Sequence, residues 1–219
     1  MTMKLIPTLL TLALLGPASL LGTPAIAATD HSAHAGAAGS GLKRSERAYT
    51  APSVPLVRQD GRKLDFAKAL DDGRPVLLNF LYTSCTAICP VTAQVFAEVR
   101  ERLGAERARV HVVSVSIDPE HDTPSRLVSY AQRFGGDEAW SFVTGSLADV
   151  VNIQRSFDSY QGDKMNHVPV TFLRAAPGAP WVRLDGFASP RQIVAELQPM
   201  LRAAPPANAP AQPLASRKP

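Results

Sequence analysis

The sequence has little cysteine, little excess charge of either sign and few long apolar runs. Only two of its 219 residues are cysteines, Cys85 and Cys89, so at most one internal disulfide can form. The net charge of +4 comes from 23 basic and 19 acidic residues, and the basic residues are scattered. Nucleic-acid binding needs a concentrated basic face, so we expect no nucleic-acid partner.

The one long apolar run lies at the N-terminus and predicts a signal peptide over residues 1–27. Lys4 gives a positive start, Leu5–Leu21 is almost entirely apolar, and small residues at 25–27 suit a cleavage site. An uncleaved membrane anchor that tethers the protein is the alternative. However, Pro and Gly interrupt the run, and it falls short of the roughly 20 residues needed to span a bilayer.

Two segments have compositions that cannot form a packed core. Residues 28–53 are mainly Ala, Gly, Ser and Thr with scattered charge, and we expect a flexible linker there. His31 and His34 could hold a metal weakly, but two solvated linker histidines are the favoured interpretation. Residues 202–219 are dominated by Ala and Pro, which predicts a disordered tail.

Between them, residues 54–201 have the size of one domain. The segment opens with a predicted hairpin, since strands at 54–57 and 63–66 flank Asp60-Gly61, a dipeptide suited to tight turns. The apolar run Pro75–Tyr82 predicts a strand that is buried on both faces. Further elements are expected as helices at 66–70, from the cysteines to 103, 124–134, 147–157 and 190–201, and as strands at 110–117, 140–143, 170–174 and 181–184.

This order of elements predicts the fold class. Strand, helix, strand, helix implies parallel strands joined by right-handed crossovers, and the last two strands pair as a hairpin. We therefore predict an α/β, thioredoxin-like three-layer sandwich: a mixed central sheet with helices on both faces, plus the N-terminal hairpin. The cysteines would lie at the carboxyl end of a parallel strand, where open α/β sheets place their sites.

The two cysteines are the main candidates for chemistry. Their spacing brings both sulfurs near the start of a helix, where the dipole lowers thiol pKa values. Two close thiolates can chelate a soft metal or oxidise to a disulfide. A purely structural disulfide across so short a loop would stabilise the fold little, because that effect grows with loop length. A reactive or metal-binding pair is therefore favoured.

A copper site would need a third ligand, and three histidines of the domain are available. His111 begins a predicted strand, and a surface or core role is favoured for it. His121 lies in the acidic loop DPEHDTP, and a solvated loop histidine is the favoured interpretation for it. His167 comes shortly before the strand at 170–174. Two thiolates with one imidazole suit copper.

Three motifs carry a family resemblance. The segments TSCTAICP, SIDPEHDTP and NHVPVTFL together resemble those of the SCO/SenC family of thioredoxin-fold copper proteins. The resemblance implies that Cys85, Cys89 and His167 bind a copper ion and that Asp118 and Asp122 lie near the site. It also implies a role in assembling the copper A centre of cytochrome c oxidase, and together with export it points to the periplasm.

The chain departs from the family pattern beside His167. The family often has Asp-His-Ser where this chain has Asn166-His167-Val168. Pro169 follows, and a cis Val168–Pro169 bond would resemble thioredoxin-fold oxidoreductases, whereas a trans proline would simply start a strand. Met165 is a further soft donor nearby, although a lone loop methionine more often only packs.

Two functions from different classes follow. The first is a copper metallochaperone, not an enzyme, which delivers copper to the copper-bearing subunit of cytochrome c oxidase or to another cuproprotein. The second is a thiol–disulfide oxidoreductase in which Cys85 attacks and Cys89 resolves. Peroxiredoxin chemistry is disfavoured, because Tyr82 stands where that family has a threonine. We also expect acid to weaken copper binding, since protons compete for thiolates and imidazole.

Overall fold

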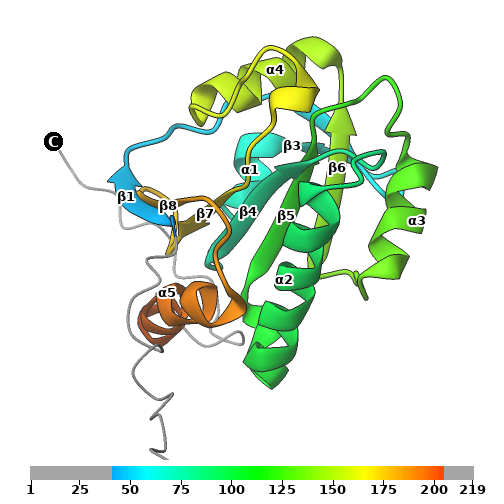
Figure 1. The fold of residues 1–219 in the computed structure, drawn as a ribbon. Coiled ribbons are helices and arrows are strands. Elements are labelled where there is room, and N and C mark those ends of the chain that lie inside the picture. Colours follow the sequence, from blue (N-terminus) through cyan, green and yellow to red (C-terminus); the bar gives the residue numbers. More distant parts are fainter. Residues whose placement is uncertain (1–40, 205–219) are drawn as a thin grey trace, which may run out of the picture. The chain divides into compact units, whose positions relative to one another are not determined.

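The computed structural model describes residues 41–204. The predicted signal peptide, most of the predicted N-terminal linker and most of the predicted C-terminal tail lie outside the described residues. The described part is built on one eight-stranded sheet with the strand order β1-β8-β7-β4-β5-β6-β2-β3 (Figure 1). The strands are β1 (Lys43–Arg47), β2 (Pro55–Arg58), β3 (Lys63–Asp65), β4 (Val76–Leu81), β5 (His111–Ser116), β6 (Trp140–Gly145), β7 (Val170–Arg174) and β8 (Trp181–Asp185).

Helices cover both faces of this sheet. In Figure 1, α2 and α5 lie in front of the sheet and α1 lies behind it, while α3 is at the right beside β6 and α4 is at the top. The helices are α1 (Phe66–Leu70), α2 (Ile88–Leu103), α3 (Pro124–Arg133), α4 (Leu147–Ser156) and α5 (Pro190–Ala203), with two short 3-10 helices, η2 (Gly104–Arg109) and η3 (Lys164–Asn166). None of the helices within residues 41–204 is long and apolar enough to cross a membrane.

The sheet is mixed, and β4 lies in its middle. β4 pairs in parallel with β5 and antiparallel with β7, and β5 pairs in parallel with β6. All six residues of β4 are buried, as expected for a strand covered on both faces. The parallel strands, the two-sided helical cover and the hairpin of β2 and β3 confirm the predicted thioredoxin-like sandwich.

The core consists of two aromatic clusters, one on each face of the sheet. On the α2 and α3 face, Trp140 stacks on Phe142 with ring centroids 4.8 Å apart. On the opposite face, Phe157 contacts Phe80 and Phe172 edge to face. Edge-to-face pairs contribute roughly 0.5–1.5 kcal/mol beyond the area they bury. Alternate residues of the strands therefore fill both layers, which holds the carboxyl end of β4 in place.

The prediction of a flexible linker over residues 28–53 is wrong for its second half. Residues 43–47 form β1, which pairs antiparallel with β8 at one edge of the sheet. Tyr49 packs its ring against Phe157 and Phe172, so this segment adds to the core. The sequence KRSER shows no alternation of apolar and polar residues. An edge strand can pair through its backbone alone, so it does not need that pattern.

The C-terminal boundary also differs slightly. α5 runs to Ala203, two residues past the predicted domain end and into the segment predicted as a disordered tail. Its start agrees with the prediction, because Ser189 caps the helix and Pro190 occupies its first turn. The ordered domain is therefore longer at both ends than the predicted 54–201.

Candidate functional site

The two cysteines lie at the junction between β4 and α2. Cys85 is in the connecting loop and 8% exposed, while Cys89 is the second residue of α2 and 1% exposed. Both thiols are free, and the Cys89 backbone N–H donates to the Cys85 Sγ at 3.4 Å. The sulfurs thus lie at the positive end of α2, as the sequence predicts.

The two thiols differ in acidity, which corrects the expectation that both pKa values fall. Burial raises the pKa of Cys85, but hydrogen bonds from Cys89, from the Ala87 N–H and from the Tyr82 hydroxyl outweigh burial and leave it below its ordinary value. Deeper burial raises the pKa of Cys89 strongly, and the adjacent Cys85 thiolate raises it further. Cys85 is therefore the more acidic thiol of the pair, and Cys89 stays protonated until a metal or a reaction removes its proton.

This asymmetry predicts selective alkylation. At pH 8, iodoacetamide is expected to modify Cys85 at least about 100-fold faster than Cys89, because only the thiolate is nucleophilic. The Cys85 rate should rise with pH and level off above its lowered pKa, at a lower pH than for an unperturbed thiol. Peptide mass spectrometry over a pH series measures both rates. In urea the two rates should converge, and equal rates in the folded protein would contradict the asymmetry.

The acidic loop of the sequence connects the cysteine loop to the sheet. Asp122 is fully buried and accepts hydrogen bonds from the Thr83 N–H at 3.1 Å, the Thr83 hydroxyl at 2.5 Å and the Ser116 hydroxyl at 2.6 Å. Because Thr83 precedes Cys85 by two residues, this carboxylate fixes the start of the cysteine loop. Its contribution is to position the cysteines.

Asp118 connects the same loop to the segment that carries His167. The Lys164 Nζ lies 2.6 Å from Asp118 Oδ2, and the His121 Nδ1 lies 3.1 Å from Asp118 Oδ1. Burial raises the pKa of Asp118, but the hydrogen bonds from Lys164 and His121 outweigh burial and keep it below its ordinary value. This ion pair fixes η3 against the carboxyl end of the sheet.

His167 follows η3 and is turned toward β4. Its Nε2 lies 3.1 Å from the Phe80 carbonyl oxygen. A carbonyl only accepts, so Nε2 carries the proton and Nδ1 keeps its lone pair. Burial lowers the pKa of His167, outweighing the opposing effect of the bond to Phe80, and the imidazole is therefore held in its neutral, metal-binding form.

The structure brings two of the three predicted ligands together. Cys85 and Cys89 are in direct contact, whereas His167 makes its contact two residues before Tyr82, on the strand that leads into the cysteine loop. Within residues 41–204, no three His, Cys, Asp or Glu side chains already form a metal-binding group. Two neighbouring cysteines, joined by the bond from the Cys89 N–H to the Cys85 Sγ, and a neutral imidazole at the same end of β4 nevertheless fit copper as a donor set.

The other two histidines within residues 41–204 are engaged elsewhere, and His31 and His34 lie outside the described residues. His111 is buried at the start of β5, and burial lowers its pKa to about 4. His121 is exposed and bound to Asp118. Both placements agree with the non-ligand interpretations favoured from the sequence.

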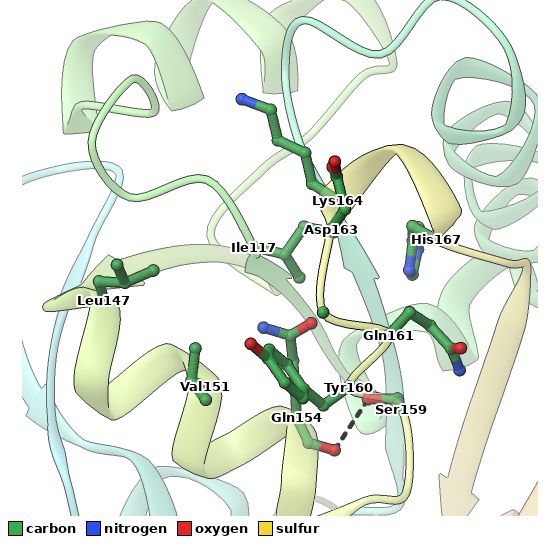
Figure 2. Close-up of a pocket in the computed structure, with 11 residues that line it drawn as sticks. Ile117, Leu147, Val151, Gln154, Ser159, Tyr160, Gln161, Asp163, Lys164 and His167 are labelled. Atoms are coloured by element: carbon green, nitrogen blue, oxygen red, sulfur yellow. Dashed lines mark hydrogen bonds between the residues drawn. The ribbon is translucent and has the colours of Figure 1, made fainter.

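A small pocket of about 170 Å³ lies beside His167. Figure 2 shows the imidazole bordering this space, with Gln154 and Val151 of α4 on one side and Lys164 above. Both polar and apolar groups line the pocket. The pocket leaves free space next to the imidazole, so core side chains do not surround the ring on that side.

Two residues of the site were not assigned a role from the sequence. The Tyr82 hydroxyl lies 3.6 Å from the Met165 Sδ. Burial, followed by a hydrogen bond to Cys85, raises the pKa of Tyr82 to about 12. The position of Tyr82 just before the cysteine loop was the sequence feature that could have indicated its place in the site.

The Val168–Pro169 bond is trans, since residues 41–204 contain no cis peptide bond, and the trans alternative therefore holds.

A thioredoxin-like domain with a free cysteine pair at the start of the helix after its central strand defines a class of dithiol proteins. Within that class, the family model SCO1/SenC matches residues 43–202. The chain belongs to the SCO1/SenC family, which confirms the resemblance seen in the three sequence motifs.

Individual relatives agree with this assignment. The chain is 32% identical to the SCO1 protein homolog of Bacillus subtilis over 98 residues, which is 44% of this chain and half the length of that relative. It is 33% identical to the SCO2-like protein RC0895 of Rickettsia conorii over 149 residues, covering 64% of this chain and 71% of that relative.

Solved structures extend the likeness to three dimensions. The structure of Bradyrhizobium japonicum ScoI with copper bound is similar over 70% of this chain and 99% of that chain, with a TM-score of 0.59 and 25% identity. The SCO1/SenC family lipoprotein of Bacillus anthracis str. Ames, at 23% identity, has a TM-score of 0.63 over 71% of this chain and 97% of that chain, which shows the shared fold.

Proposed function

We propose that this protein is a copper metallochaperone that binds one copper ion through Cys85, Cys89 and His167. The observation that carries the proposal is the pair of free cysteines at the start of α2, where the Cys89 backbone N–H donates to the Cys85 Sγ at 3.4 Å. Thiolates select Cu(I), and imidazole accepts either oxidation state of copper. The copper-bound ScoI of Bradyrhizobium japonicum, which shares this fold, supports copper as the cargo.

We assign each proposed ligand a part. Cys85 offers the more acidic thiol of the pair, and Cys89 would supply a second sulfur once its proton is displaced by the incoming cation. His167 contributes Nδ1, because Nε2 is held by the Phe80 carbonyl. Copper binding then completes a site in which the imidazole joins the sulfurs.

The recipient would be the copper-bearing subunit of cytochrome c oxidase or another cuproprotein. BsSco, a relative in fold, is described as a member of the Sco family of cytochrome c oxidase assembly proteins. Transfer by ligand exchange suits a site at the carboxyl end of the sheet, because a partner's ligands can replace those of the chaperone one at a time. With the signal peptide predicted at residues 1–27, the exchange would take place in the periplasm.

A second candidate function rests on the unequal acidity of the thiols. In thiol–disulfide exchange, the Cys85 thiolate would attack a partner disulfide, form a mixed disulfide and release one partner thiolate. Cys89 would then pass its proton to that thiolate and attack the Cys85 sulfur, closing the Cys85–Cys89 disulfide and releasing the second partner sulfur as a thiolate. The partner gains two electrons and this chain loses two.

A titration of the full chain with Cu(I) under anaerobic conditions tests the proposal. The reduced protein is expected to bind one Cu(I) per chain in competition with a chromophoric Cu(I) chelator, and protein oxidised to the Cys85–Cys89 disulfide should bind at least about 1,000-fold more weakly, since a disulfide offers no thiolate. Equal, weak binding by both forms would reject the metallochaperone and leave thiol–disulfide exchange as the better account.

A further inference from the structure

Met165 is the most exposed large apolar side chain in the described part of the protein. Its relative exposure is 73%, and the next values in residues 41–204 are 51% for Leu147 and Phe187. Single exposed apolar residues are common on protein surfaces, so exposure alone says little. The position of the Met165 sulfur, next to the proposed site, is what suggests a function for this exposed side chain.

The backbone around Met165 is held firmly. Its N–H donates to Asp163 Oδ1 at 2.9 Å, and the N–H of His167 donates to the Lys164 carbonyl at 3.1 Å. The ion pair of Lys164 with Asp118 fastens the same turn to the end of the sheet. Met165 and His167 therefore share one rigid turn, which is the turn that supplies the imidazole.

The thioether is also connected to the cysteines. The Tyr82 hydroxyl lies 3.6 Å from Met165 Sδ, a hydrogen bond in which the phenol donates to sulfur. The Cys85 N–H donates to the Tyr82 carbonyl oxygen at 3.2 Å. Tyr82 thus contacts both Met165 and Cys85, and the exposed thioether touches the residue that leads into the cysteine loop.

We propose that Met165 is an additional, Cu(I)-selective sulfur ligand at the mouth of the site. This inference rests on the proposed function and deepens it by naming a ligand and an oxidation state. A thioether is neutral and soft, so it binds Cu(I) in preference to Cu(II). No electron moves in the step: the Sδ lone pair coordinates Cu(I), and the Tyr82 hydroxyl gives up its hydrogen bond to that sulfur.

The location explains what such a ligand adds. Cys85 and Cys89 are nearly inaccessible, so an incoming ion meets the exposed Sδ first and passes inward to the thiolates. In the reverse direction, Met165 holds Cu(I) while a partner's ligands replace the cysteines. A neutral thioether suits this exchange because it binds less tightly than a thiolate and releases the ion more readily.

The test compares Met165→Leu with wild type in the full chain, with Met200→Leu as the matched control. Leucine has similar volume and no sulfur, and Met200 lies on α5 as a partly buried core neighbour. In competition with a Cu(I) chelator, Met165→Leu is expected to bind Cu(I) about 10-fold more weakly. Its Cu(II) affinity and thermal midpoint should be unchanged, and Met200→Leu should match wild type in Cu(I) affinity.

X-ray absorption gives a direct readout of the ligands. Wild type loaded with Cu(I) should show three sulfur neighbours and Met165→Leu two. Unchanged Cu(I) affinity and unchanged sulfur number in Met165→Leu would overturn the inference, while loss of binding in Cys85→Ser would still support the proposed function. Equal losses of Cu(I) and Cu(II) affinity would also overturn it, and wild type that binds no Cu(I) would reject the proposed function itself.

Discussion

Replacing either cysteine by serine is expected to lower the affinity for Cu(I) by at least about 1,000-fold, because a hydroxyl is a hard donor that keeps its proton. The structure holds the two cysteines next to each other, with the Cys89 N–H bonded to the Cys85 Sγ, so removing one sulfur leaves the other without a chelate partner. The measurement is a competition titration of Cys85→Ser and Cys89→Ser against a chromophoric Cu(I) chelator.

A control from the same loop accompanies this pair. Ser84 is exposed and adjacent to Cys85, and Ser84→Ala should bind Cu(I) like wild type. Thermal unfolding shows whether each serine variant is folded, which matters most for Cys89 because its side chain is fully buried. A folded serine variant that keeps its affinity within tenfold of wild type would remove that cysteine from the ligand set.

His167→Ala is expected to lower copper affinity by about 100-fold or more while leaving the thiol chemistry intact. The imidazole is held neutral and is the proposed nitrogen donor, and its Nε2 is bonded to the Phe80 carbonyl rather than to a cysteine. Copper affinity comes from the same titration, and the alkylation rate of Cys85 reports on the thiols. The alkylation rate should stay within about twofold of wild type.

His121→Ala is the matched control for this variant. His121 is exposed and bound to Asp118, in the loop next to the site, yet we assign it no ligand role. The variant should therefore bind copper with unchanged affinity. If His121→Ala lost affinity and His167→Ala did not, the third ligand would have been misassigned.

Together the two experiments separate the candidate functions. Both depend on Cys85 and Cys89, so the serine variants alone do not distinguish them. Only copper delivery depends on His167, since thiol–disulfide exchange needs no nitrogen donor. The His167→Ala variant could still reduce a partner disulfide but no longer hold copper. That result would show that the same two sulfurs serve both copper binding and thiol–disulfide exchange in the wild-type protein.

Much of the fold could be predicted because its signals are local. The helix start at Pro124 follows from Thr123 as a capping residue with proline in the first turn, and the structure has both. The strand at 170–174 is bounded as its sequence predicts. Such signals depend on neighbouring residues only, so they can be seen without the tertiary structure.

β1 was not predicted, because no local sequence pattern indicates a strand there. Its five residues are charged or polar and mostly exposed, and it exists because β8 offers a free edge to pair with. Tyr49 gave an apolar hint, but its partners Phe157 and Phe172 are more than 100 residues away.

For the site, the sequence by itself determined which residue types are present and where the cysteines lie, at the junction of a strand and a helix. It also identified the family, because three motifs in order are specific. Only the tertiary structure decided how these groups differ. Burial separates the acidity of two equivalent-looking thiols, and the Phe80 carbonyl selects the tautomer of His167. Tyr82 meets Met165 across 83 positions of sequence. Solvation and long-range contacts set these properties, and both arise only when distant segments pack together.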